Sequence, residues 1–146
     1  MAGHEAFVAA PSPRRRHMVM HDFEPGWDTY VERPGYGVSA DMAVADVDAA
    51  GFDAVLVLGG RTPEYLRHNA QVLDLIRAFA AQGKWLFASC HGIQVFNAAG
   101  VAAGRKVTCY EHVRSEVAQA GGEWQAAQTW ESQPEFYREV MGCLQS

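Results

Sequence analysis

The residues best suited to chemistry are Cys90 and its neighbour His91, in the segment Ala88-Ser89-Cys90-His91-Gly92. Small residues stand two positions before and two after the cysteine, where a short apolar run passes into a helical pattern. This arrangement is typical of a nucleophile elbow, a tight turn that strains the central residue and exposes its side chain at the carboxyl edge of a sheet. We therefore expect Cys90 to be a nucleophile. The alternative is a small apolar residue that fills the core.

The helix that follows Cys90 adds an electrostatic argument, because unpaired N–H groups at a helix N-terminus favour a thiolate over a thiol. Gly59 and Gly60 end the preceding strand, and their amides, with that of His91, are candidates to hold an oxyanion. His91 is a candidate base or acid. A residue next to an elbow nucleophile often points away from it, so both orientations of His91 stay open.

Two further groups of residues need an interpretation. Tyr110, followed by Glu111 and His112, comes after a strand end and is expected to line the pocket. Cys109 and Cys143 lack a comparable setting, and we interpret both as structural. Only Cys90 is therefore assigned reactivity.

The elements that position the elbow follow from the apolar pattern. An unbroken apolar run at 54–58 ends in two glycines, as a strand covered on both faces would. A helical stretch begins at Pro63, carries apolar residues at intervals of three and four, and stops at Gly83. Residues 85–89 predict a second buried strand. Strand, helix and strand in this order predict two parallel strands with a right-handed crossover.

The segments on either side of this unit continue the alternation of strands and helices. The expected strands cover 6–10, 17–21 and 107–110, and the expected helices cover 91–99, 112–120 and 134–144. A basic turn at 12–16 is interpreted as a solvated loop, and 25–37 as a long hairpin or flap. The class is therefore α/β with a mostly parallel sheet, in one domain over residues 1–146.

Composition restricts the partners. The 146 residues carry a formal charge of −5 and a pI near 5.6, which disfavour nucleic acid and membrane surfaces and favour a small neutral or polar ligand. Three cysteines without a CxxC pair predict neither a disulfide framework nor a zinc site, and we expect no metal or cofactor. A reducing cytoplasm is the natural interpretation of this cysteine usage, and no apolar run is long enough to span a membrane.

The stretch from Asp53 to Gly122, and more loosely from Gly3 to Asp53, resembles the PfpI/ThiJ family of the class I glutamine amidotransferase-like superfamily. The residues that carry the resemblance are Gly59-Gly60-Arg61-Thr62-Pro63-Glu64-Tyr65-Leu66-Arg67, Ala88-Ser89-Cys90-His91-Gly92, Ala98-Ala99-Gly100-Val101 and Gly104-Arg105-Lys106. The resemblance implies a flavodoxin-like three-layer sandwich and a homodimer or higher assembly. It also implies peptidase, glyoxalase or deglycation chemistry, or stress protection, with Arg61 beside the oxyanion site.

Two departures from the family pattern are expected. Members begin with a strand and helix that carry a glutamate hydrogen-bonded to the cysteine, whereas this chain resembles the family only after them, and Glu5 is not that glutamate. A second gap is expected at 125–129, where hardly any of the expected strand pair is present. We therefore expect impaired turnover.

Three functions remain open. The first is a cysteine-dependent enzyme in which Cys90 adds to the carbonyl carbon of a small carbonyl or acyl compound. The second is a stress or redox-responsive protein that uses Cys90 as an oxidation sensor without turnover. The third is a degenerate relative in which Cys90 is buried and inert.

Overall fold

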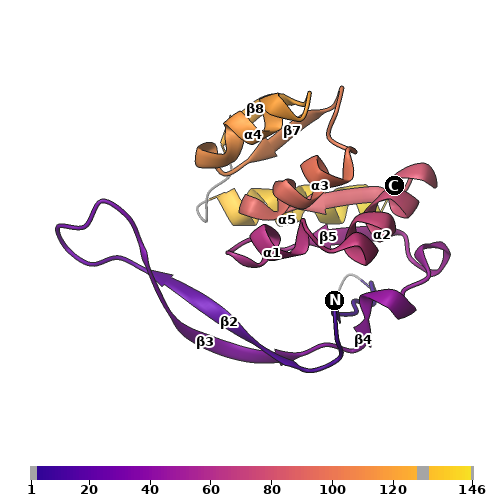
Figure 1. Cartoon of the computed structure of the whole chain (residues 1–146), viewed down its shortest axis with the longest axis horizontal. Coiled ribbons are helices and arrows are strands. Elements are labelled where there is room, and N and C mark those ends of the chain that lie inside the picture. Colours follow the sequence, from indigo (N-terminus) through magenta and orange to yellow (C-terminus); the bar gives the residue numbers. More distant parts are fainter. Residues whose placement is uncertain (1–2, 128–131, 146) are drawn as a thin grey trace. The chain divides into compact units, whose positions relative to one another are not determined.

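The computed structural model describes residues 3–127 and 132–145. Its contacts divide the chain into two compact units, residues 3–47 and residues from 48 onward, and each is described by itself (Figure 1). That the two form one domain stays a prediction. No helix in the described ranges is long and apolar enough to cross a membrane.

The first unit is built around a β-hairpin. Strand β2 (Arg15–Asp22) pairs antiparallel with β3 (Val31–Ser39), with a bulge between His17 and Val19. The strand expected at 17–21 is confirmed, whereas the stretch 25–37 is not a hairpin by itself, because the first arm of the hairpin is β2. Arg15 and Arg16 belong to β2, which makes our expected loop at 12–16 too long, because both residues pair across to β3. The short strands β1 (Ala9–Ala10) and β4 (Met42–Ala43) pair in parallel, and the 3₁₀ turn η1 (Val44–Asp46) follows.

The second unit contains the predicted parallel pair. After the 3₁₀ turn η2 (Ala49–Gly51), strand β5 (Ala54–Val57) pairs with β6 (Trp85–Ala88), with Val57 facing Ala88. The predicted single helix between them is two helices, α1 (Thr62–Leu66) and α2 (Ala70–Ala81). The break has a local cause, because the Asn69 side chain accepts the N–H of Val72 at 3.2 Å and caps the second helix.

Beyond β6 the chain turns through η3 (Cys90–Gly92) into helix α3 (Ile93–Ala99), which ends at Gly100 with a left-handed φ of 77°. Strand β7 (Lys106–Cys109) then pairs in parallel with β8 (Glu123–Ala127). Between them lie η4 (Glu111–Val113) and α4 (Arg114–Gln119), and α5 (Gln133–Leu144) follows. The gap expected at 125–129 is wrong for 125–127, which belong to β8, and residues 128 and 129 lie outside the described residues.

The fold is mixed α/β, but its described strands form four separate pairs rather than one sheet. The interruption in the second unit lies at a cavity of about 320 Å³, lined by Leu86, Phe87 and Ala88 of β6 and by Val107 and Thr108 of β7. The buried core of this unit joins α2 and α3 to the β5–β6 pair. Its most buried side chains include Ile76, Phe79, Ile93, Val95, Cys109 and Val117.

Candidate functional site

The segment between β6 and α3 holds a strained backbone at Cys90. The N–H of Ser89 still bonds to the carbonyl of Val57 at 2.9 Å, so the strand pairing continues up to the cysteine. Cys90 then adopts a φ of 54°, and among the described residues other than glycine it alone has a positive φ. Such a conformation costs an L-residue roughly 1–2 kcal/mol, so the surrounding structure must impose it.

Two glycines make room for this turn. A Cβ on Gly59 would lie 2.7 Å from the Cβ of Cys90, and a Cβ on Gly92 would collide with the backbone carbonyl oxygen of Val57. Both contacts would be closer than normal van der Waals contact. At Gly92 the collision is with the backbone of Val57, which cannot rotate away as a flexible side chain could. The close approach of β5 to the turn thus requires glycine at positions 59 and 92.

The sulfur of Cys90 has polar groups around it. Its Sγ lies 3.2 Å from Nδ1 of His91, and the backbone N–H groups of His91 and Gly60 also donate to it. Burial raises the pKa of the Cys90 thiol above its ordinary value, although these two backbone hydrogen bonds act to lower it. Desolvation of the thiol thus acts against the thiolate, whereas the two backbone donors favour it, as expected of a helix N-terminus.

The ring of Tyr110 packs against that of His91. The two ring centroids are 5.2 Å apart, and the N–H of Tyr110 bonds to the carbonyl of Cys90 at 3.4 Å. Burial, followed by the nearby Cys90 and Glu111, raises the pKa of the Tyr110 phenol. His112 packs edge-on against the same ring at 4.9 Å. Residues 110–112 do not line the cavity between β6 and β7, so their expected role in lining a pocket stays a prediction.

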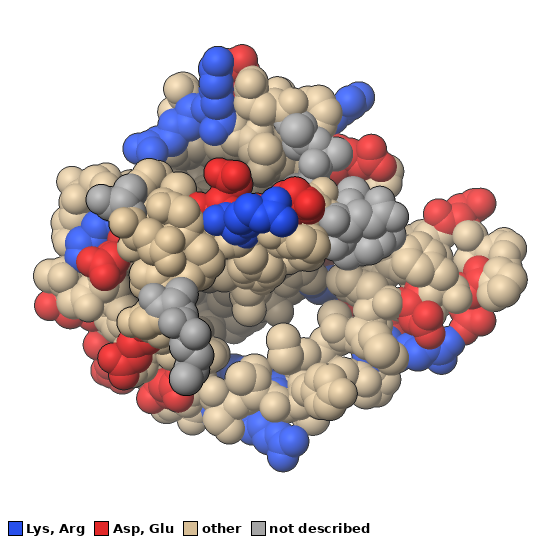
Figure 2. Space-filling view, turned by 180° about the vertical axis from the view of Figure 1, so that it is seen from behind, with Lys and Arg blue, Asp and Glu red and all other residues tan. Residues whose placement is uncertain are grey.

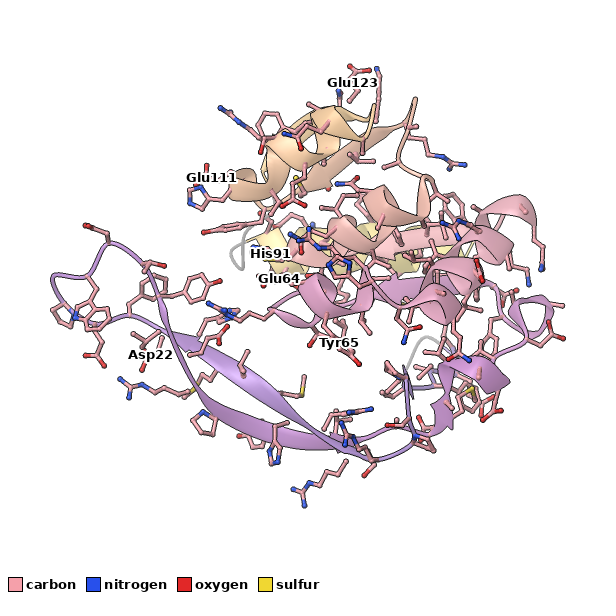
Figure 3. The ribbon with its side chains drawn as sticks, in the orientation of Figure 1. Asp22, Glu64, Tyr65, His91, Glu111 and Glu123 are labelled. Carbon is pink, nitrogen blue, oxygen red and sulfur yellow. The ribbon has the colours of Figure 1, made fainter. Side chains whose placement is uncertain are left out.

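The remaining predicted residues come from the β5–α1 connection. Gly60 has a left-handed φ of 75°, and Arg61 is an exposed residue at the N-cap of α1. Helix α1 contacts η3, and Figure 3 shows Glu64 and Tyr65 of this helix in the same region of the unit as His91. Gly59 and Gly60 are thus next to the cysteine turn, as the shared edge of two parallel strands requires, and the role of Arg61 stays a prediction.

The other two cysteines are in different surroundings. All three are free thiols. Cys109 is fully buried, and its burial, reinforced by Cys90 and Glu116, raises its pKa to about 11. Cys143 is half-buried on α5, away from the cysteine turn in sequence. In the described ranges no three His, Cys, Asp or Glu residues converge as a metal site would need.

A partly buried polar network near the site has no counterpart in our sequence analysis. The Gln94 amide nitrogen donates to both carboxylate oxygens of Glu116, at 3.0 and 3.3 Å, and Arg67 donates to the same carboxylate at 3.1 Å. These residues come from α3, from α4 and from the end of α1. Their separation of 22 and 49 positions leaves no local signal, apart from the polarity of Gln94 on an otherwise apolar helix face.

Comparison with known proteins identifies relatives over most of the chain. The family model described as the DJ-1/PfpI family matches residues 3–140. The Pyrococcus horikoshii protein named Deglycase PH1704 is 34% identical over 122 residues, which cover 84% of this chain and 65% of the relative. Protein DJ-1 homolog D of Arabidopsis thaliana is 35% identical over 141 residues, which cover 86% of this chain and 36% of the relative. The chain thus spans less than two thirds of either relative.

Solved structures show the same fold at lower identity. The ThiJ/PfpI domain protein of Brachyspira murdochii superposes with a TM-score of 0.81 at 20% identity, over 99% of this chain and 82% of that one. Drosophila melanogaster DJ-1beta gives a TM-score of 0.67 at 21% identity, over 75% and 65%. At these identities the superpositions establish the fold.

Proposed function

The chain belongs to the DJ-1/PfpI family, and from that premise we propose that it is a cysteine-dependent enzyme acting on small carbonyl or acyl compounds, with Cys90 as nucleophile. The observation that carries the proposal is the position of the Cys90 sulfur, 3.2 Å from an imidazole nitrogen of His91 in a strained strand-to-helix turn. The names of relatives add support, since proteins at about 35% identity are called deglycases.

We assign the turn at Cys90 the role of a nucleophile elbow. A left-handed residue between a strand and a helix presents its side chain at the carboxyl end of the sheet, where ligands of α/β folds bind. The strain at φ 54° is maintained by Gly59 and Gly92, whose missing side chains allow the backbone to approach. Strain of this kind is kept where a residue has a task, which weakens the interpretation of Cys90 as inert filling.

The first chemical step follows from the contact with His91. Burial raises the pKa of the thiol, so a base that takes its proton assists the attack. Nδ1 of His91 accepts the proton while Sγ bonds to the carbonyl carbon and the carbonyl π electrons move to oxygen. With an aldehyde, His91 returns the proton to that oxygen and a hemithioacetal forms. With an acyl compound, the proton goes to the departing amine or alcohol, and water hydrolyses the resulting thioester.

The developing oxyanion requires hydrogen-bond donors. The N–H groups of Gly60 and His91 already donate to the sulfur, so they lie close to an oxygen on the carbon that the sulfur attacks. Gly59 allows the close approach of the two strands. We assign substrate binding to Arg61, whose charge suits an anionic group, and to Tyr110, whose ring packs against His91.

The raised pKa disfavours the alternative function of an oxidation sensor. Sensor cysteines have a low pKa and are open to solvent, because oxidants react with the thiolate. Burial raises the pKa of Cys90 instead, and the side chain is half-buried. An enzyme that deprotonates its thiol only when substrate is present fits these properties better.

The test is adduct formation and turnover with methylglyoxal, a small α-oxoaldehyde. We expect intact-mass analysis to detect a reversible adduct on the wild type and none on Cys90→Ser, with product formation measured by NMR depending on Cys90. Cys109→Ser is the matched control and should keep the adduct, because Cys109 is fully buried. An adduct that persists in Cys90→Ser, or turnover equal in that variant, would refute the proposal.

A further inference from the structure

One buried polar side chain in the second unit has no part in the chemistry described above. Gln94 lies on α3, four residues after Cys90, and is only 5% exposed. Its amide nitrogen donates to both carboxylate oxygens of Glu116, whereas its amide oxygen Oε1 has no partner among the described residues. Burial of a half-satisfied amide lowers stability, so packing alone does not explain why this residue is a glutamine.

The carboxylate that binds Gln94 also binds Arg67. Nη1 of Arg67 donates to Oε2 of Glu116 at 3.1 Å, and about a third of each of these two side chains is exposed. Figure 2 shows acidic and basic side chains mixed over the face that it presents, and ion pairs on such a surface contribute little because water screens them. This pair differs from an ordinary surface pair, because the third member of its network, Gln94, is buried.

The three residues of this network come from three segments that supply the site. Arg67 ends α1, the helix that begins just after Gly60. Gln94 belongs to the helix that follows the cysteine turn, and Glu116 belongs to α4, which follows Tyr110. One carboxylate therefore joins the segment with the Gly60 donor, the segment with the nucleophile and the segment with the Tyr110 ring.

Helix α1 connects the position of Arg67 to that of Gly60. The first turn of this short helix is anchored by the fully buried Pro63, and the N–H of Arg67 bonds to the Pro63 carbonyl at 3.0 Å. One anchor leaves a short helix free to tilt, whereas a second anchor at its other end fixes its direction. The bond to Glu116 is that second anchor. The direction of α1 determines where the N–H of Gly60, which donates to the sulfur of Cys90, is placed.

We propose that the network around Glu116, here called the Glu116 clamp, positions the N–H of Gly60 at the sulfur of Cys90. The clamp consists of Arg67, Gln94 and Glu116. Because it acts through α1 and the backbone, its members are positioning residues. Its consequence for turnover rests on the function proposed above, since the same N–H is assigned to the developing oxyanion. Its effect on the thiol needs no substrate.

The pH dependence of Cys90 alkylation tests the clamp. Peptide mass spectrometry follows labelling by iodoacetamide across pH, where the midpoint reports the pKa of the thiol and the plateau at high pH reports access of the reagent. The Gly60 donor favours the thiolate, so its displacement should move the midpoint to higher pH and slow labelling at neutral pH about tenfold. We expect this result for both Arg67→Ala and Glu116→Ala.

The two alanine variants separate positioning from a direct effect of charge. Loss of the Arg67 cation by itself disfavours the thiolate, whereas loss of the Glu116 anion by itself favours it. A direct effect of charge therefore moves the two midpoints in opposite directions, and the clamp moves both upward. Midpoints that move in opposite directions, or that stay at the wild-type pH, would overturn the proposal. If circular dichroism shows an alanine variant to be unfolded, Arg67→Met or Glu116→Gln takes its place, since each removes the charge and retains more of the side chain.

Gln94→Met separates positioning from stability. Methionine has a similar volume, and it removes the unpartnered oxygen together with the bonds to Glu116. Urea unfolding should show a free energy of unfolding equal to or above that of wild type, while the labelling midpoint moves upward. The matched control is Arg77→Ala, because Arg77 also bonds to α3, at the Ala99 carbonyl at 3.1 Å, but at the end of the helix away from Cys90. It should lower stability and leave the midpoint unchanged. Lower stability in Gln94→Met with an unchanged midpoint would contradict the clamp.

Turnover of methylglyoxal distinguishes failure of the clamp from failure of the function. Shifted midpoints in the clamp variants, with no Cys90-dependent turnover in the wild type, would refute the function and support the clamp. Cys90-dependent turnover with unchanged midpoints would support the function and overturn the clamp. Where both are correct, kcat should fall about tenfold or more in Glu116→Ala with KM within about threefold of wild type, because the Gly60 donor acts on the transition state.

Discussion

The Sγ atom of Cys90 lies 3.2 Å from Nδ1 of His91, although the two residues are neighbours in sequence. In an extended strand adjacent side chains point to opposite faces. The left-handed backbone of Cys90 interrupts this alternation and brings both side chains to one side of the turn. The orientation of His91, which the sequence left open, is thus decided by one backbone angle.

The first prediction concerns His91 as a proton acceptor. Because burial raises the pKa of the Cys90 thiol, we expect its alkylation to depend on the imidazole at Sγ. His91→Ala should slow labelling of Cys90 by iodoacetamide about tenfold or more, measured by peptide mass spectrometry over time. His68→Ala, at an exposed histidine outside this contact, is the control and should label at the wild-type rate. Equal rates in all three proteins would exclude base assistance by His91.

The second prediction concerns stability at high pH. Burial raises the pKa of Cys109 to about 11 in the folded chain, whereas in the unfolded chain the thiol titrates near its ordinary value. The unfolded state then loses its proton first, so the stabilising contribution is complete below about pH 9 and is lost as the pH rises toward 11, by about 2–3 kcal/mol. Urea unfolding of the wild type should show this loss. The free energy of unfolding of Cys109→Ala should lack this loss at high pH. If the wild type and the variant lost stability equally as the pH rises, the prediction would be contradicted.

The third prediction concerns Gly92. A methyl group there collides with the carbonyl oxygen of Val57, so Gly92→Ala should lower the free energy of unfolding by roughly 1–3 kcal/mol and disturb the turn at Cys90. Gly142 on α5 has no heavy atom near the corresponding position, and Gly142→Ala should raise stability by about 0.5–1 kcal/mol through helix propensity. Chemical denaturation measures both. A neutral Gly92→Ala would mean that β5 does not approach the turn so closely.

The fourth prediction concerns the backbone strain at Cys90. Glycine tolerates a φ of 54° and alanine does not, so Cys90→Gly should be more stable than Cys90→Ala by about 1 kcal/mol. Both variants lose the thiol and should form no adduct with methylglyoxal. Thermal or urea unfolding of the pair measures the difference, which isolates the strain because both substitutions remove the same sulfur. If alanine proved the more stable, the left-handed conformation would be wrong.

Much of the fold could be predicted because its signals are local. The apolar run ending in Gly59 and Gly60 and the run before Cys90 predict β5 and β6, and their parallel pairing is confirmed. The helix break at Asn69 was missed, since the apolar period continues through it and only the cap marks the boundary. The separation of β6 from β7 was also missed, because strand pairing depends on contacts between distant segments.

By itself the sequence determined the family, the strand-turn-helix segment around Cys90 and the small residues that this turn requires. These features depend on which residue types occur at fixed spacings, because steric limits on the backbone determine the local structure that such a pattern can adopt. Only the tertiary structure decided that His91 contacts the sulfur and that Gln94, Arg67 and Glu116 form one network. It also decided that burial raises the pKa of Cys90 while two backbone donors act to lower it. Interatomic distances and desolvation are properties of the folded chain, because both depend on which groups from distant parts of the sequence surround an atom.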